Sequence, residues 1–265
     1  MDGPSTPPRR PVRLLHASDL HLHWEQASHA LASVRGLAAA AMRDGAEAVL
    51  MAGDIFDTAN QPAAFVEEIA AAFAHFTQPV VVIPGNHDIR YSATEPDALG
   101  DLRDLLADHH RVIVAHEGES LSLADGALEV WGRGMPEHSP RNDPLQGIPC
   151  APRSGAWRVV IAHGELMDEH GLSRSSPIIL ERHRDALDGV DYVALGHHDA
   201  HSLHEWGRTV VCYSGSASPL QGTSSYALVE LADPHGARVS IARWDATTDH
   251  PPRTDASGPD APDVT

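Results

Sequence analysis

The chain has 265 residues, of which 42% are hydrophobic and 21% are charged, and this composition excludes an intrinsically disordered or fibrous protein. Its 19 basic residues are all arginine and face 37 acidic residues, which gives a formal net charge of −18. A body this acidic repels nucleic acid and anionic membranes at long range, so tight, processive binding of duplex DNA is not expected.

The two ends of the chain differ from its middle. Residues 1–11 and 245–265 are rich in proline and lack apolar periodicity, so we predict that both are disordered tails. No internal repeat and no long linker interrupts residues 12–244. We therefore interpret that stretch as a single domain, long enough to bury a sizeable core.

Strands and helices alternate in the first part of this domain. Apolar residues at helical spacing predict helices over 26–43, 62–76 and 96–107. Apolar runs predict strands near 12–17, 46–52, 79–83, 111–115, 120–123, 127–131, 157–162, 190–195, 201–206, 209–213, 226–231 and 238–242. This βαβ alternation, followed by mainly β segments, predicts an α/β fold of two packed sheets with mixed strand directions and helices outside.

Neither cysteine usage nor hydropathy indicates a location outside the cytoplasm. Cys150 and Cys212 lie far apart and do not suggest a disulfide framework or a sulfur-ligated metal. The N-terminal residues lack the apolar core of a signal peptide. No apolar stretch approaches the roughly 20 residues that span a bilayer. We predict a cytoplasmic protein without a membrane partner.

Five of the apolar runs end in the same polar residue types, namely aspartate, asparagine and histidine. The segments that follow them are Asp19–His21, Gly53–Asp57, Gly85–Asp88, His163–Gly164 and Gly196–Asp199. Strands that repeatedly deliver such residues at their C-terminal ends build a site in the crevice beyond the sheet. Buried together without a cation, these side chains would leave uncompensated charge and unpaired polar groups, so the pattern favours a metal centre.

The types of ligand narrow the choice of metal. Carboxylate, amide and imidazole donors without thiolate suit manganese, iron, zinc or cobalt. Two carboxylates, an asparagine and three histidines are too many for one tetrahedral zinc ion. They are enough for two ions that share a bridging carboxylate, about 3.5–4 Å apart, as in two-metal hydrolases.

The ordered motifs Asp-x-His, Gly-Asp-x-x-Asp, Gly-Asn-His-Asp, His-Gly and Gly-His-x over residues 19–199 resemble those of the calcineurin-like metallophosphoesterases. Within that family, "LLHASDLHL", "AGDIFD" and "VIPGNHD" look most like the DNA repair exonuclease branch, the nuclease subunit of the double-strand-break repair complex. The resemblance implies a four-layer α/β/β/α sandwich and a dinuclear centre. It also implies that a metal-bridging hydroxide attacks the phosphodiester, and it leaves a partner ATPase or a homo-oligomer open.

The resemblance also implies a role for each motif residue. Asp19 and His21 would hold one metal and Asp54 would bridge. The other metal would be held by Asn86, His163 and His197. His87 would protonate or polarise the leaving oxygen, with Asp57 orienting its imidazole. The segment Tyr213–Ser216 resembles a Tyr-x-Gly-Ser segment near the site in the nuclease branch.

One motif departs from the family pattern. The family usually ends with Gly-His-x-His, whereas Asp199 stands here where the second histidine should be. We favour Asp199 as a ligand of the first metal. The alternatives are His198, His201 or a first site with three protein ligands. An added carboxylate favours a harder ion, so we expect two Mn²⁺ ions, with iron, zinc and cobalt as alternatives.

Arg90 and Tyr91 follow the Gly-Asn-His-Asp motif and are candidates for binding the substrate phosphate, with surface placement as the alternative. The function that the sequence favours is a metal-dependent phosphodiesterase, with DNA or short nucleotides among its candidate substrates. The alternatives are a phosphomonoesterase or protein phosphatase on the same dinuclear site, or a catalytically silent metal-bound scaffold.

Overall fold

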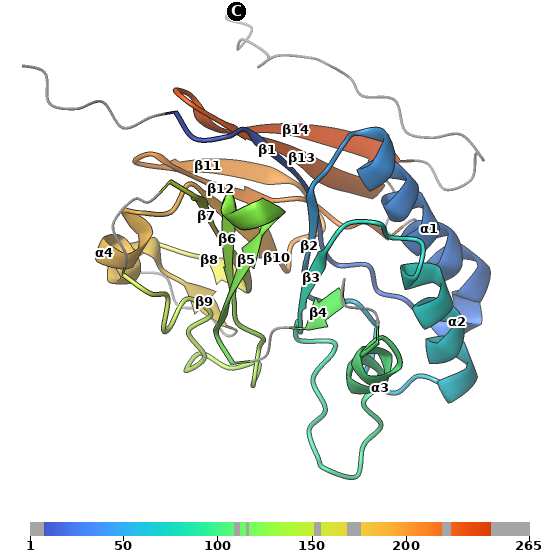
Figure 1. Ribbon diagram of the computed structural model, residues 1–265. Coiled ribbons are helices and arrows are strands. Elements are labelled where there is room, and N and C mark those ends of the chain that lie inside the picture. The colour runs from blue at the N-terminus through green and yellow to red at the C-terminus, as the bar shows by residue number, and fades with distance from the viewer. Residues whose placement is uncertain are drawn as a thin grey trace, which may run out of the picture.

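The computed structural model describes residues 8–108, 112–114, 117–150, 155–168, 176–218 and 224–244. Residues 1–7 and the predicted C-terminal tail lie outside the described part. Two six-stranded sheets form the centre of the molecule (Figure 1). None of the described helices is long and apolar enough to cross a bilayer.

The first sheet has the strand order β14-β13-β1-β2-β3-β4. Strands β1 to β4 are parallel, and β13 pairs antiparallel with both β1 and β14. Its members are β1 (Val12–Ala17), β2 (Ala48–Ala52), β3 (Val80–Ile83), β4 (Val112–Val114), β13 (Ser224–Ala232) and β14 (Gly236–Trp244).

The second sheet has the order β11-β12-β10-β7-β6-β5, with a parallel centre and antiparallel edges. Its members are β5 (Glu119–Leu123), β6 (Leu128–Gly132), β7 (Trp157–His163), β10 (Tyr192–Gly196), β11 (Ser202–Trp206) and β12 (Thr209–Tyr213). Two short strands, β8 (Glu165–Leu166) and β9 (Pro177–Ile178), pair beside it.

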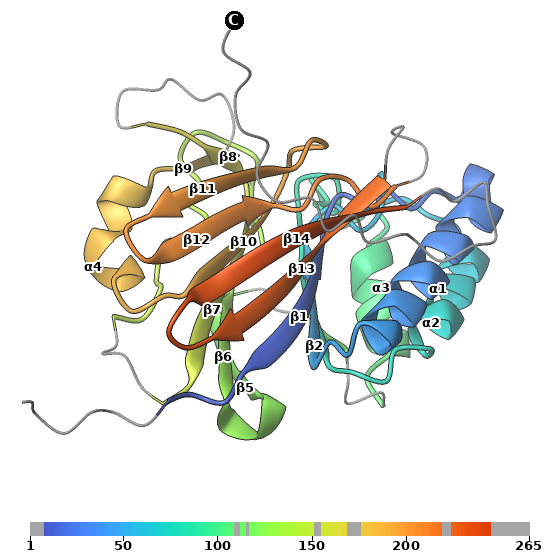
Figure 2. The ribbon, with the colours of Figure 1, turned by 90° about the horizontal axis from the view of Figure 1, so that it is seen from above.

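Helices cover the outer faces of both sheets, which confirms the predicted four-layer α/β/β/α sandwich (Figures 1 and 2). On the first sheet lie α1 (Ala27–Arg43), α2 (Ala63–Phe73) and α3 (Ala98–Leu105), close to their predicted ranges. The second sheet is covered more thinly, by α4 (Arg184–Leu187) and the 3-10 turn η3 (Leu180–His183). Two further 3-10 turns are η1 (Trp24–Gln26) and η2 (Ala124–Gly126).

Successive side chains along each strand point to opposite faces of its sheet and so belong to different hydrophobic cores, of which the described residues form three. In β1, Leu15 faces the core under the helices, whereas Leu14 faces the core between the sheets. In β10, Tyr192 faces the core between the sheets and Val193 packs on the α4 side. Because each fully buried aliphatic side chain contributes about 1.5–3 kcal/mol, a one-residue slip in either strand would be strongly unfavourable.

Residues 1–11 are predicted to be a disordered tail, but the structure describes residues 8–11 and packs Arg9 against the folded body. The Arg9 guanidinium lies 3.3 Å from the centre of the Trp157 ring. It also contacts the carboxylates of Asp191 at 2.9 Å and Asp233 at 3.1 Å. A proline-rich composition predicts a tail, but an arginine can pack its stem and charge against a distant strand, which local composition does not reveal.

Candidate metal centre

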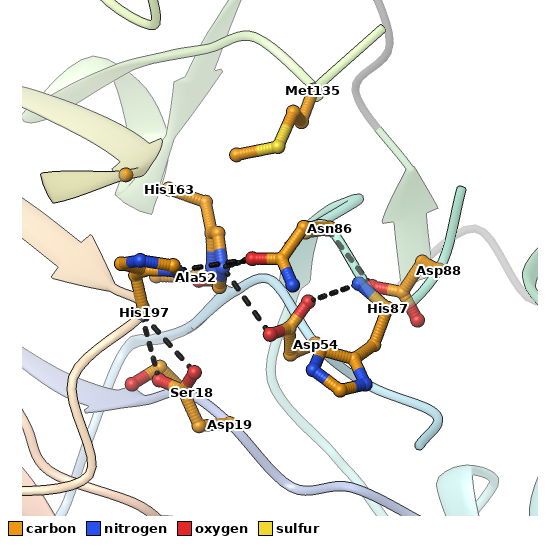
Figure 3. Close-up of polar contacts among 12 residues, drawn as sticks. Ser18, Asp19, Ala52, Asp54, Asn86, His87, Asp88, Met135, His163 and His197 are labelled. Carbon is orange, nitrogen blue, oxygen red and sulfur yellow. Dashed lines mark hydrogen bonds and ion pairs between the residues drawn. The ribbon is translucent and has the colours of Figure 1, made fainter. Parts of the chain in front are cut away.

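The polar side chains that follow β1, β2, β3, β7 and β10 meet beyond the C-terminal ends of these strands. Figure 3 shows the residues that come together, from both sheets: Asp19, Asp54, Asn86, His87, His163 and His197. The meeting point arises because the central strands of each sheet are parallel, so that their carboxyl ends lie at one edge.

The side chain of Asn86 lies between two imidazoles. Its Oδ1 is 3.1 Å from His163 Nε2 and 3.0 Å from His197 Nδ1. His163 Nδ1 donates a hydrogen bond of 2.7 Å to the carbonyl of Ala52, so in the neutral ring Nε2 presents its lone pair to the centre. That Nε2 is also 3.3 Å from Asp54 Oδ2. Lone-pair atoms from three residues therefore converge, which is the arrangement that a bound cation stabilises.

Burial and the neighbouring charges together shift the pKa values of this cluster. Burial alone lowers the pKa of His163, but the adjacent Asp54 and Asp19 carboxylates outweigh it and raise that pKa to about 9. Burial raises the pKa of Asp19. Burial also acts to raise the pKa of Asp54, but His163 outweighs it and holds this pKa well below its usual range. Burial lowers the pKa of His197 to about 4.

Backbone groups hold the two carboxylates in place. The Asp19 carboxylate accepts the His197 N–H at 3.0–3.1 Å, and Asp54 Oδ1 accepts the His87 N–H at 2.8 Å. Asp19, Asp54 and His197 all have positive φ, at 52°, 52° and 111°. His21 shares this conformation at 45°. Such backbone is unfavourable for residues with a Cβ and clusters at functional sites in proteins.

His21, His87 and Asp57 form a second, more open part of the site. The His21 and His87 rings meet edge to face, with centroids 4.6 Å apart. His21 Nδ1 is buried without a hydrogen-bond partner and lies 3.4 Å from an Asp57 carboxylate oxygen. His87 Nδ1 donates to the backbone carbonyl of Asp57 at 2.7 Å, whereas the Asp57 carboxylate is 4.0 Å away. Asp57 thus orients His87 through its main chain.

Among the described residues, two sets of ligand atoms lie within 4.8 Å of one another: His21, Asp54 and His87, and Asp19, Asp54 and His163. Asp54 belongs to both sets. The donors are hard or borderline, and the unpartnered His21 Nδ1 is an orphaned buried atom that a cation would satisfy. The residues present therefore fit a pair of divalent ions with Asp54 between them.

Asp199 and its two alternatives lie outside these sets. Asp199 is exposed, and its backbone carbonyl accepts the Ser216 N–H at 2.9 Å. His198 is exposed and packs its ring edge to face on Tyr213, with centroids 4.8 Å apart. His201 is also exposed. A role for any of the three as a ligand stays a prediction.

The two predicted substrate-binding residues point to different surroundings. The Arg90 guanidinium lies 3.7 Å from the Asp97 carboxylate and lines a pocket with Asp88 and Arg103. Tyr91 is exposed and lines a different pocket, together with His87. The structure therefore brings Tyr91, but not Arg90, into the surroundings of His87.

The segment Tyr213–Ser216 hydrogen-bonds to the backbone beside His163 and Asp19. The Tyr213 hydroxyl donates to the carbonyl of Gly164 at 2.7 Å and accepts the Leu166 N–H at 2.7 Å. The Ser216 hydroxyl donates to the carbonyl of Asp19 at 2.8 Å. These bonds tie the segment that follows His163 and the loop that carries Asp19 to the end of β12.

Sequence reasoning missed the roles of two residues. The buried Asp88 carboxylate accepts the backbone N–H groups of Ile55, Phe56 and Gly85 at 2.9–3.1 Å and so ties two motif loops together. Burial raises the pKa of Asp88 to about 7. Its position in Gly-Asn-His-Asp was a usable signal. For His138 the sequence offered no signal, because this residue lies in an irregular loop. Its ring is 5.8 Å from that of His197, and its Nδ1 is buried without a described partner.

Two packed mixed sheets with an Asp/Asn/His cluster at their common edge define the class of protein, a metallophosphoesterase. Residues 12–212 match the calcineurin-like phosphoesterase family, and the chain belongs to this family. Members of this family are hydrolases that use divalent metals, which accounts for the Asp, Asn and His residues in the motifs.

Individual relatives add detail. The SbcD subunit of the SbcCD nuclease of Bacillus subtilis (strain 168) is 35% identical over 96 residues, which are 32% of this chain and 25% of that protein. The crystal structure of TT1561 of Thermus thermophilus matches with a TM-score of 0.59 at 12% identity, over 87% of this chain and 98% of that one. GAP50 of Plasmodium, named as the anchor in the inner membrane complex, matches with a TM-score of 0.52 at 11% identity, over 92% and 88%. These two structures show a shared fold.

Proposed function

We propose that the protein is a phosphodiesterase with a dinuclear metal centre that acts on nucleotides or short single strands. The observation that carries this proposal is the sharing of Asp54 between two sets of ligand atoms. A shared carboxylate is the feature that distinguishes a two-metal hydrolase site from a mononuclear one.

The assignment to the two ions follows the motif resemblance: Asp19, His21 and Asp54 would hold the first ion, and the second would be held by Asp54, Asn86, His163 and His197. It differs from the two sets of ligand atoms, in which Asp19 lies with His163, and His87 lies with His21. When bound, two divalent ions polarise the phosphoryl oxygens and lower the pKa of a water molecule toward neutrality. These donors, all oxygen or imidazole nitrogen, suit manganese, iron, zinc or cobalt, and the expected ion is Mn²⁺ because an added carboxylate from Asp199 would favour a harder ion. Asp88 holds the loops that present Asp54 and Asn86.

His87 is the proposed acid for the leaving oxygen. Its Nδ1–H is engaged by the Asp57 carbonyl, so the proton that it gives away is held at Nε2. Its side chain is 41% exposed, so a substrate can reach it. The Asp57 carboxylate lies 3.4 Å from His21 Nδ1 and 4.0 Å from His87 Nδ1, beside both rings.

Charge and similarity together support small substrates. The formal net charge of −18 disfavours tight binding to a duplex, whose phosphates need local cations. Similarity to a nuclease subunit supports a nucleotide-type diester, but it covers a quarter of that protein. A partner ATPase therefore stays a proposal, as does a cytoplasmic location.

The decisive test is hydrolysis of bis-p-nitrophenyl phosphate by chelator-treated protein, with and without Mn²⁺. We expect Mn²⁺-dependent turnover that His87→Ala lowers by about 10²–10⁴-fold. The matched control is His204→Ala, which removes an exposed histidine of β11 away from the centre. Faster turnover of p-nitrophenyl phosphate than of the diester would contradict a phosphodiesterase, and metal binding without any turnover would support a silent scaffold.

Asp199→Asn decides the composition of the first site. A loss of Mn²⁺ binding as large as that in Asp19→Asn would identify Asp199 as a ligand. Binding close to wild type would exclude Asp199 and leave His198, His201 or a first site with three protein ligands.

A further inference from the structure

A pocket of about 550 Å³ opens beside His87. The residues that define its chemistry are Asp57, Asn60, Asn86, His87, Tyr91 and Glu95. This volume lies within the range of small-molecule sites. Because His87 and Asn86 form part of its wall, this pocket adjoins the metal centre on its His87 side.

The pocket wall is negatively charged. Asp57 and Glu95 contribute two carboxylates, and no arginine is among the described residues that line it. Arg90 is next to Tyr91 in the sequence, but its guanidinium is directed to Asp97 and lines a separate pocket. A second phosphate placed here would meet two carboxylates without a compensating arginine, so the wall disfavours anionic groups.

Tyr91 presents an aromatic ring at this pocket. Tyr91 is 76% exposed, the highest value among the exposed large hydrophobic residues of the described chain. The turn that carries it is anchored, because Glu95 Oε2 accepts the Tyr91 N–H at 2.6 Å and the Ser92 N–H at 3.3 Å. An exposed ring on an anchored turn is a stacking surface whose backbone is already ordered.

We propose that this pocket binds the leaving group of the phosphodiester and selects an uncharged aromatic group of nucleoside size, stacked on Tyr91. The inference rests on the proposed function, in which His87 protonates the leaving oxygen. Stacking on an aromatic side chain is sequence-tolerant because every base has a π face. The two carboxylates then favour a diester whose leaving nucleoside carries no further phosphate.

The first test measures binding without turnover, so that it is independent of the catalytic proposal. Adenosine, which has no phosphate, is titrated into the Mn²⁺-loaded protein and followed by ligand-observed NMR. We expect Tyr91→Ala to weaken binding about tenfold and Tyr91→Phe to preserve it. Trp24→Ala is the control, because it removes an exposed aromatic residue that does not line the pocket. Equal affinity in wild type and Tyr91→Ala would overturn the proposal.

The second test addresses charge. The values of kcat/KM are compared for three substrates. The first is a dinucleoside monophosphate, the second is the same compound with an added 3′ phosphate, and the third is the same compound with an added 5′ phosphate. We expect kcat/KM to fall at least about fivefold when the added phosphate is on the leaving nucleoside, and Glu95→Gln to reduce this discrimination. Glu95→Gln keeps an oxygen that can accept the Tyr91 N–H. Equal kcat/KM for all three substrates would overturn the selectivity. Adenosine binding without diester hydrolysis would refute the proposed function alone.

Discussion

The two parts of the metal centre are built in different ways. Around His163 and Asn86, the side chains are largely buried and are fixed by hydrogen bonds to Ala52 and to one another. Around His87 and Asp57, the side chains are 41% and 46% exposed, and the His87 ring is held by one main-chain carbonyl. The first part is fixed by buried hydrogen bonds, whereas the second faces solvent.

This difference indicates a division of labour. A buried, multiply bonded cluster keeps ligand atoms in place before an ion binds, which lowers the cost of binding. An exposed histidine with one fixed nitrogen keeps its other nitrogen available for proton transfer. Substitutions in the two parts should therefore have separable effects on metal binding and on turnover.

The largest effect is expected for Asp54→Asn, because Asp54 is shared by the two parts. Its loss weakens both sets of ligand atoms, and metal ions contribute several kcal/mol to stabilising charge in phosphoryl transfer. We expect diesterase turnover to fall at least about a hundredfold and the number of bound Mn²⁺ ions, measured by equilibrium dialysis, to drop. Two tightly bound ions in this variant would refute the bridging role.

His163→Ala and His87→Ala test the buried part and the exposed part of the centre separately. His163→Ala removes a buried ligand, so we expect weaker Mn²⁺ binding and a smaller rise in melting temperature when Mn²⁺ is added. His87→Ala should lower turnover about 10²–10⁴-fold while that rise in melting temperature stays close to wild type. Calorimetry of both variants with and without chelator provides the measurement. Equal losses of metal-dependent stability would show that the two parts are not separable.

Gly53→Ala tests how tightly the buried part is packed. A Cβ at Gly53 would collide with the His163 ring, and φ there is +87°. Gly126→Ala is a matched control, because φ is +84° and nothing lies within 4 Å of a Cβ. Both variants bear the cost of positive φ, about 1–2 kcal/mol. We expect Gly53→Ala to lower the free energy of unfolding further, and similar values from urea denaturation would contradict the packing argument.

The smallest effect concerns a histidine behind the centre, between the sheets. His16 is fully buried, its Nδ1 is 2.8 Å from the Tyr192 hydroxyl, and burial lowers its pKa to about 3. Below pH 6.5 the unfolded chain binds a proton at His16 and the folded chain does not, so stability falls as the pH drops from 6.5 toward 3. Between pH 7 and pH 5 this amounts to about 1–2 kcal/mol.

His16→Gln keeps a polar group near Tyr192 but does not titrate in this range. We expect its stability to fall less than that of the wild type between pH 7 and pH 5. Denaturant unfolding at the two pH values measures this difference. An identical pH dependence would show that His16 is not the group responsible.

The sequence alone determined the class of fold and most of the candidate site. Apolar runs that end in Asp, Asn or His indicated which side chains meet, because the strands before them are buried and parallel and their ends must lie at one sheet edge. Helices α1, α2 and α3 follow from apolar periodicity, which is a local property of the chain.

Other features were decided only by the tertiary structure. The direction of the Arg90 side chain depends on Asp97, and the place of His138 depends on an irregular loop beside His197. The pocket at Tyr91 exists because separate loops close around it. No local pattern specifies these features, because each depends on side-chain rotamers and on contacts made across loops. The sequence thus indicated most of the residues that meet at the centre, whereas packing left Asp199 outside the two sets of ligand atoms and turned Arg90 toward Asp97.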